Sequence, residues 1–195
     1  MPIEATIPRP TYKAPDPVKV KAKVAAYLDG LKTFHAQFQQ YTPNQPVAEG
    51  RFSLKRPGKF LWEYDTPDAL KLVSDGGLIY FQDLATNQVT QVPRDGLADL
   101  LTRRHIKFDQ DGLNVTSIKA ENGIIYLTLH LPAPGPDGSA QDVTLGFIED
   151  PIQLRQVRTI DQFGQMVRVV FYDVRENDPM ADKTFAFTPP QYKEK

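Results

Sequence analysis

Apolar residues first recur at helical spacing over residues 17–30. Positions three or four apart form one apolar stripe, made of Val20, Val24, Tyr27, Leu28 and Leu31. Asp16 stands near the start of this segment and Gly30 near its end, and both residue types are typical of helix termini. The pattern predicts an amphipathic helix over 17–30, whose apolar face must cover another part of the protein.

Beyond this helix, apolar and polar residues alternate, which is the period of a half-buried strand. Turn-forming residues such as Lys55-Arg56-Pro57-Gly58 and Glu121-Asn122-Gly123 separate the alternating runs and are typical of hairpins. Consecutive strands should therefore pair antiparallel, and a sheet of this length must curl. We predict a mainly β protein with about eleven strands, at 34–41, 48–55, 59–65, 70–75, 78–83, 88–92, 113–119, 124–131, 142–149, 152–162 and 165–173.

Three segments depart from this alternation. Residues 94–104 return to helical spacing and predict a second, short helix, through Leu97, Leu100 and Leu101. Residues 132–138 are rich in proline and glycine and predict an exposed hairpin loop. Five prolines in residues 1–17 predict an extended N-terminal arm, which leaves residues 18–195 as a single domain.

Composition narrows the class of protein. Hydrophobic residues make up 41% of the 195 residues and charged residues 24%, a balance that excludes a disordered or membrane-embedded chain. No run approaches the roughly 18 apolar residues of a membrane-spanning helix. Because 23 basic residues nearly cancel 24 acidic ones, no overall field attracts nucleic acid, and we expect no nucleic-acid partner.

The chain has no cysteine, which excludes disulfides, thiolate metal sites, cysteine nucleophiles and lipidation of an N-terminal cysteine. The start, Met1-Pro2-Ile3-Glu4, lacks the basic and apolar regions of a signal peptide. Both a cytoplasmic chain and a mature exported form without its leader remain compatible with this start.

The polar residues offer little chemistry. His35, His105 and His130 are the only histidines, and no two have the spacing that would place both on one metal ion. The loop Ser74-Asp75-Gly76-Gly77 lacks the lysine of a phosphate-binding loop and is better explained as a turn. No nucleophile and base form a recognisable constellation. We therefore expect no enzyme, no metal and no cofactor.

Aromatic residues are more informative, because many of them lie on predicted strands. Phe60, Trp62 and Tyr64 share one face of a single strand by their period of two. Two interpretations remain open: the aromatic residues fill a solid core, or a wide sheet leaves an apolar cavity among them. These aromatic residues include Phe34, Phe38, Phe52, Phe60, Trp62, Tyr64, Tyr80, Phe81, Phe147 and Phe171.

Four sequence blocks together resemble one known family. They are Phe34-His35-Ala36-Gln37-Phe38, Gly50-Arg51-Phe52-Ser53-Leu54-Lys55-Arg56-Pro57-Gly58-Lys59-Phe60-Leu61-Trp62, Leu72-Val73-Ser74-Asp75-Gly76 and Phe185-Ala186-Phe187-Thr188-Pro189-Pro190. In this combination the chain resembles the LolA family of periplasmic carriers of outer-membrane lipoproteins, from about residue 20 to residue 190.

The resemblance implies an incomplete antiparallel β-barrel of about eleven strands, with a lid of short helices over a hydrophobic cavity. It assigns Arg56 as the latch that holds the lid shut. Phe60 and Trp62 would face the cavity. Because Phe60 starts its strand, we expect it to be partly exposed at the rim if the cavity mouth lies beside the lid, with Trp62 deeper. The acyl-chain cavity that the resemblance implies comprises Phe34, Phe38, Phe52, Leu54, Phe60, Trp62, Leu97, Leu100 and Leu101.

For function, the resemblance implies a monomeric periplasmic carrier in its mature form, with acylated lipoproteins as cargo and no cofactor. An inner-membrane ABC transporter of the LolCDE type would load it, and an outer-membrane receptor, of the LolB type or unknown, would unload it. Two alternatives stay open. The same fold would also suit a carrier of free lipid or glycolipid, or a regulatory protein that senses lipoproteins.

Overall fold

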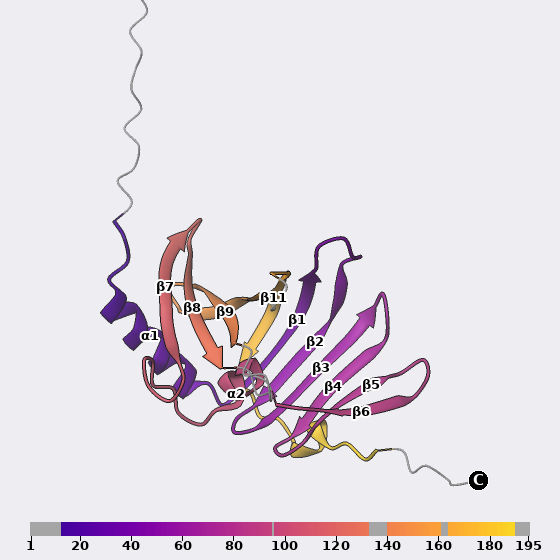
Figure 1. Cartoon of the computed structure of the whole chain (residues 1–195). Helices are drawn as coiled ribbons and strands as arrows, with labels where there is room; N and C mark the ends of the chain where they lie inside the picture. The colour runs from indigo at the N-terminus through magenta and orange to yellow at the C-terminus, as the bar shows by residue number, and fades with distance from the viewer. Residues whose placement is uncertain (1–12, 95, 133–139, 161–163, 190–195) are drawn as a thin grey trace, which may run out of the picture.

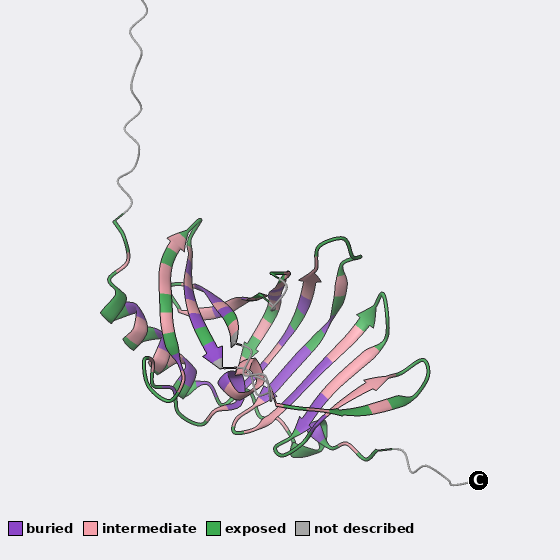
Figure 2. Ribbon diagram, viewed as in Figure 1, coloured by how far each residue is buried: buried purple, intermediate pink, exposed green. Residues whose placement is uncertain are grey.

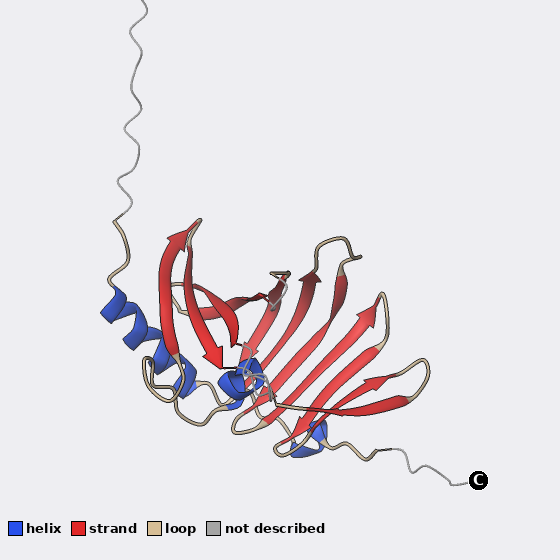
Figure 3. Ribbon diagram, in the orientation of Figure 1, coloured by secondary structure: helices blue, strands red, loops and turns tan. Residues whose placement is uncertain are grey.

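The computed structural model describes residues 13–94, 96–132, 140–160 and 164–189, and its core is one curved antiparallel sheet (Figures 1 and 3). The first 12 residues of the Pro-rich arm and most of the predicted loop at 132–138 lie outside these ranges. In order along the described chain, the elements are α1 (Pro17–Gly30), β1 (Thr33–Tyr41), β2 (Ala48–Lys55), β3 (Lys59–Thr66), β4 (Leu70–Asp75), β5 (Ile79–Asp83), β6 (Gln88–Val92), α2 (Gly96–Thr102), β7 (Asn114–Glu121), β8 (Ile124–Pro132), β9 (Ala140–Ile148), β10 (Gln153–Ile160), β11 (Met166–Glu176) and the 3-10 helix η1 (Asp182–Phe185).

The sheet consists of two meanders. Strands β1 to β6 follow one another as hairpins, and so do β7 to β11, which confirms the antiparallel pairing and the mainly β fold. The two meanders join where β1 pairs with β11, with Phe38 opposite Phe171. Between them, α2 interrupts the succession, so β6 and β7 are not paired and form the two edges. The barrel is therefore incomplete, and Figure 1 shows its open, curved outline.

Alternation along the strands separates a buried face from an exposed one. On β8, Ile125, Leu127, Leu129 and Leu131 are buried, while the residues between them are half-buried or exposed. The buried positions of neighbouring strands lie side by side in the register, as at Leu127 opposite Leu145 of β9. In Figure 2, the buried segments of β2 to β4 lie toward the ends of these strands that are near α2. The concave face therefore carries the main hydrophobic core.

Aromatic rings fill the centre of this core. The Phe34 and Phe171 rings meet edge to face with centroids 5.3 Å apart, and the Phe52 and Trp62 rings lie 4.5 Å apart. Phe38 packs against Trp62 at 5.3 Å. Such contacts add about 0.5–1.5 kcal/mol per pair to the free energy of area burial. The solid-core interpretation thus holds for this part of the concave face.

Helix α1 covers the half of the sheet formed by the second meander. Asp16 caps it by accepting a hydrogen bond from the Val18 amide at 3.0 Å. The buried stripe is Val20, Val24 and Leu28, as the helical spacing predicted. The Tyr27 ring packs edge-on against Phe147 of β9 at 5.7 Å. The predicted helix over 17–30 is confirmed, and so is its role as a cover.

A second, smaller apolar cluster lies on the opposite face of β3 to β5. There, Phe185 of η1 is fully buried against Leu61 and Val73. Phe187 places its ring 5.0 Å from that of Tyr80. We call residues 180–187 the C-terminal clasp. Its packing on the outer face was not predicted from the sequence.

Ion pairs hold the clasp in addition to apolar contacts. Asp182 lies 2.8 Å from the Lys55 ammonium and 3.0 Å from that of Lys59, which lowers the pKa of its carboxyl to about 2. Lys55 also donates to the Met180 carbonyl.

Among the described helices, none is long and apolar enough to cross a bilayer.

Candidate ligand-binding cavity

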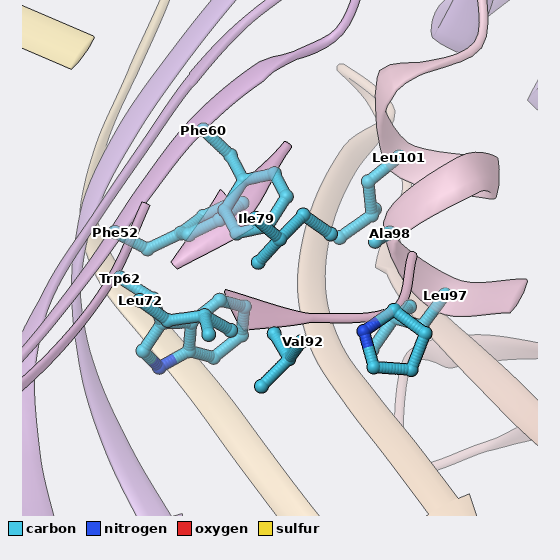
Figure 4. A pocket seen from close by; sticks show the side chains of 10 residues that line it. Phe52, Phe60, Trp62, Leu72, Ile79, Val92, Leu97, Ala98 and Leu101 are labelled. Carbon is cyan, nitrogen blue, oxygen red and sulfur yellow. The ribbon is translucent and has the colours of Figure 1, made fainter. Parts of the chain in front are cut away.

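An apolar cavity of about 270 Å³ lies between α2 and the concave face of β2 to β6. In Figure 4, rings and aliphatic side chains from the sheet face the side chains of α2 across the cavity. Because no lining side chain carries a charge, the cavity suits an apolar ligand and offers no group for acid–base chemistry. The lining residues are Phe52, Phe60, Trp62, Leu72, Ile79, Val92, Pro93, Leu97, Ala98 and Leu101.

The register of the sheet explains why these side chains converge. Trp62 of β3 lies opposite Leu72 of β4, and Phe60 lies two residues earlier on the same face. From the other side, α2 presents Leu97 and Leu101, one helical turn apart, with Ala98 beside them. The short side chain of Ala98 leaves space that a larger residue would fill.

A second groove, of about 510 Å³, continues along the same strands toward the end of the sheet that is far from α2. Tyr64, Leu70 and Phe81 extend the apolar face, while Gln40, Thr42, Thr66 and Asp68 add polar groups. The Tyr64 hydroxyl donates to Gln40 Oε1 at 2.7 Å, and burial raises the pKa of Tyr64. The concave face therefore runs from a wholly apolar end beneath α2 to a partly polar end.

Arg56 connects the ends of both helices from the β2–β3 turn. Its guanidinium donates to the Leu28 carbonyl near the end of α1 and to the Arg103 carbonyl just after α2. Helix C-termini carry partial negative charge, which favours a guanidinium there. The Arg56 side chain is partly buried, burial lowers its pKa, and its Nε has no hydrogen-bond partner among the described residues.

The structure separates the expected cavity residues into two groups. Phe52, Phe60, Trp62, Leu97 and Leu101 line the cavity. The other four are buried in the adjoining core and do not line it, namely Phe34, Phe38, Leu54 and Leu100.

The expected exposure of Phe60 at the rim is wrong. Phe60 is 4% exposed and Trp62 is 8% exposed, so neither is a wet rim residue and Phe60 is the deeper of the two. The reason is α2, which lies directly over this end of β3 and covers both rings (Figure 4).

Five lining residues were not identified from the sequence: Leu72, Ile79, Val92, Pro93 and Ala98. Alternation on the predicted strands would have placed Leu72 and Ile79 on the face of Trp62, once the register of β3 to β5 was known. Val92 and Pro93 carry no such signal, because their place depends on how the chain turns from β6 into α2.

A histidine of β1 lies on the face of the sheet opposite the cavity. His35 contacts Ser53 at 2.9 Å on the outer face, and burial lowers its pKa. Within the described ranges, no three histidine or acidic residues are grouped so that they could hold a metal ion.

Together, the curved antiparallel sheet, the covering helices and the uncharged cavity define a protein that binds apolar ligands. The family model "Outer membrane lipoprotein carrier protein LolA" matches residues 29–188, and this chain belongs to that family. Helix α2 lies over the cavity, whereas α1 packs against the second meander.

Two relatives agree with this assignment. An outer-membrane lipoprotein carrier protein from Methylococcus capsulatus is 31% identical over 87% of this chain and 84% of its own length. One from Chromobacterium violaceum is 32% identical over 91% of this chain and 87% of its own length.

Solved structures support the fold. An outer membrane lipoprotein-sorting protein domain from Vibrio parahaemolyticus superposes with a TM-score of 0.53, at 14% identity over 85% of this chain and 94% of that one. An uncharacterised protein from Thermus thermophilus gives a TM-score of 0.52, at 10% identity over 89% of this chain and 95% of that one.

Proposed function

We propose that this protein carries acylated lipoproteins across the periplasm, from the inner membrane to the outer membrane, without catalysing a reaction. One observation carries the proposal beyond family membership: the uncharged cavity beneath α2, closed by side chains from the sheet and the helix. Acyl chains are the apolar part of a lipoprotein, and such a cavity removes them from water.

Burial provides the affinity for cargo. Each buried methylene contributes about 0.8 kcal/mol, so an acyl segment of about ten methylenes gains on the order of 8 kcal/mol before any cost is subtracted. A carrier must also release its cargo. The gain must therefore be offset by a cost in the loaded protein.

The size of the cavity indicates where that cost arises. Ligand pockets usually enclose about 300–1,000 Å³, whereas the cavity beneath α2 encloses about 270 Å³. A cargo with several acyl chains needs more space than this. It must displace α2, extend into the adjoining groove of about 510 Å³, or do both.

In this proposal, Arg56 sets the cost of displacing the helices. Its hydrogen bonds to the Leu28 and Arg103 carbonyls exist only while α1 and α2 are in their closed positions. Loading breaks these bonds, so the empty closed form competes with the loaded open form. Cargo then passes to a receptor that binds it at a lower cost.

The partners follow from this cycle. We propose that an inner-membrane ABC transporter of the LolCDE type loads the protein. An outer-membrane receptor, of the LolB type or a different protein, then receives the cargo. The periplasmic location and the monomeric state belong to the same proposal.

The test is lipoprotein release from spheroplasts of a bacterium lacking its own carrier. The wild-type protein should release lipoproteins into the medium. Ala98→Leu, which fills the cavity, should fold normally and release little. Ala26→Leu introduces the same side chain at an exposed position of α1 and is the matched control.

Mass spectrometry of the bound material decides between cargoes. A diacylglyceryl-modified peptide in the wild-type protein supports the proposal. Free lipid or glycolipid alone, without release of lipoproteins from spheroplasts, would replace it with the alternative of a lipid carrier.

A further inference from the structure

Arg94 links three segments around the lid helix, although it lies outside the cavity lining. Arg94 precedes α2, and its side chain extends to the C-terminal end of that helix, where its Nη1 donates to Thr102 Oγ1 at 3.0 Å. Its Nη2 donates to Ser74 Oγ at 2.8 Å and to the carbonyls of Gly58 and Gly77 at 3.4 and 3.3 Å. One guanidinium thus joins α2 to the β2–β3 and β4–β5 turns.

Both hydroxyl partners are oriented by further hydrogen bonds. Thr102 donates to the Ala98 carbonyl at 2.6 Å, and Ser74 donates to the Gly58 carbonyl at 2.7 Å. Each hydroxyl therefore donates its proton to a carbonyl and keeps a lone pair that accepts from Arg94. The donated hydrogen bonds hold both hydroxyls in this orientation. Ser74 is fully buried and Thr102 is 5% exposed, so the junction is shielded from competing water.

Backbone contacts tighten the same junction. The Gly58 amide donates to the Thr102 carbonyl at 3.0 Å. Gly58 has a φ of +81°, and a Cβ there would lie 3.1 Å from the Gly76 Cα. Only glycine allows the two turns to approach this closely beneath α2.

Ion pairs of α1 connect it to the other meander and to the segment that leads into β7. Lys23 pairs with Glu149 at 2.8 Å, Lys21 pairs with Asp109 at 2.7 Å, and the Tyr27 hydroxyl accepts from the Leu154 amide at 3.0 Å. The described partners of Arg94 include no residue of α1. Arg56, by contrast, contacts both helices, and Asp29 of α1 accepts from the Ile106 amide at 2.8 Å.

We propose that Arg94 is a positioning residue that keeps α2 attached to β3–β5 when the contacts of Arg56 break. Arg56 opposes separation of the two helices, whereas every Arg94 contact can persist during that separation. Opening then moves α1 and α2 apart, while α2 continues to wall the cavity. Loss of Arg94 therefore has the opposite effect on bound ligand to loss of Arg56. This inference rests on the proposed carrier function.

The test compares Arg94→Gln with Arg56→Leu in the full chain. Hydrogen exchange reports on residues 96–102 and 17–30, and dissociation of an environment-sensitive fluorescent fatty acid reports on the cavity. Arg94→Gln should raise exchange in 96–102 and the dissociation rate constant about tenfold, which corresponds to about 1.4 kcal/mol, and leave 17–30 unchanged. Arg56→Leu should slow dissociation.

Three further variants keep the test decisive. Thr102→Val preserves shape and removes one Arg94 partner, so it should reproduce a smaller part of the effect even if Arg94→Gln folds poorly. Arg51→Gln, on the outer face where its partners are Glu63 at 3.6 Å and Asp65 at 3.4 Å, is the control and should change neither readout. Arg94→Lys keeps the positive charge but lacks the planar guanidinium with its several donors. It should therefore not restore the wild-type dissociation rate.

The proposal is overturned if exchange in 96–102 is unchanged in Arg94→Gln, or if it rises equally in 17–30, because Arg94 would then only add general stability. A protein that binds no fatty acid in any form refutes the carrier function instead. The exchange comparison decides the role of Arg94 in either case, since it needs no ligand.

Discussion

Replacing Arg56 by leucine should yield a protein that takes up acylated cargo and releases it slowly. The substitution removes the donors to the Leu28 and Arg103 carbonyls and keeps an aliphatic stem of similar reach. The fold should persist, because Arg56 lies in the β2–β3 turn outside the main core.

The hydrogen bonds of Arg56 determine how much free energy it contributes to the closed state. Two charge-assisted hydrogen bonds contribute about 1.5–3 kcal/mol each to the closed state. Part of this is offset by the partly buried guanidinium, whose Nε has no partner among the described residues, at a cost of about 1–3 kcal/mol. The difference spans about 0–5 kcal/mol, and its middle value of about 2–3 kcal/mol shifts the ratio of closed to open protein by about 30–150-fold.

The assay is transfer of a fluorescent acylated peptide from the carrier to acceptor vesicles. Arg56→Leu should load as completely as the wild type. Its transfer rate should be lower by at least tenfold, and a tenfold change corresponds to about 1.4 kcal/mol. Arg51→Leu, at an exposed arginine of β2, is the control. Equal transfer rates for Arg56→Leu and wild type would falsify the latch.

Three further predictions concern stability. Phe60→Glu should lower the free energy of unfolding by several kcal/mol, since a side chain 4% exposed would carry an unpaired charge; an unchanged melting temperature would contradict its burial. Phe185→Ala should cost about 3–5 kcal/mol in urea unfolding, whereas a loss below about 1 kcal/mol would mean that the clasp contributes little. Because Lys55 and Lys59 lower the pKa of Asp182 from 3.8 to about 2, its contribution is complete above about pH 4 and is lost as the pH falls through 2. Asp182→Asn should remove that part of the acid dependence, and identical acid titrations of both proteins would argue against it.

Helices and strands were predicted well, because each produces a periodic pattern among residues that are close together in the sequence. The stripe at Val20, Val24 and Leu28 located α1, and alternation located the strands to within a few residues. The pairing of β1 with β11 has no local signal, since it depends on how two meanders meet across most of the chain. The outer-face position of Phe185 has the same origin: its apolar character was visible, but the partners Leu61 and Val73 were not.

The candidate site was predicted in part. Phe60 and Trp62 were placed on one face by their spacing, and both line the cavity. The prediction of which ring lies deeper was wrong. Depth depends on where α2 lies, and the spacing of residues within β3 carries no information about that position. Arg94 carried no signal at all, because an arginine beside a predicted helix is usually solvated. Besides Thr102 of α2, its partners Gly58, Ser74 and Gly77 lie 17 to 36 residues earlier, at turns whose position relative to α2 no local pattern reveals.

The β1–β11 seam also constrains how the chain reaches its folded state. Phe38 and Phe171 face each other across it, although roughly 130 residues separate them, and such distant contacts slow folding. The first meander can form early, but its aromatic residues Phe34 and Phe52 gain their partner Phe171 only after the last strand is available. Until then these aromatic rings lack part of the core that buries them and expose apolar surface to water. We therefore expect refolding to be limited by completion of the seam and to compete with aggregation at high protein concentration.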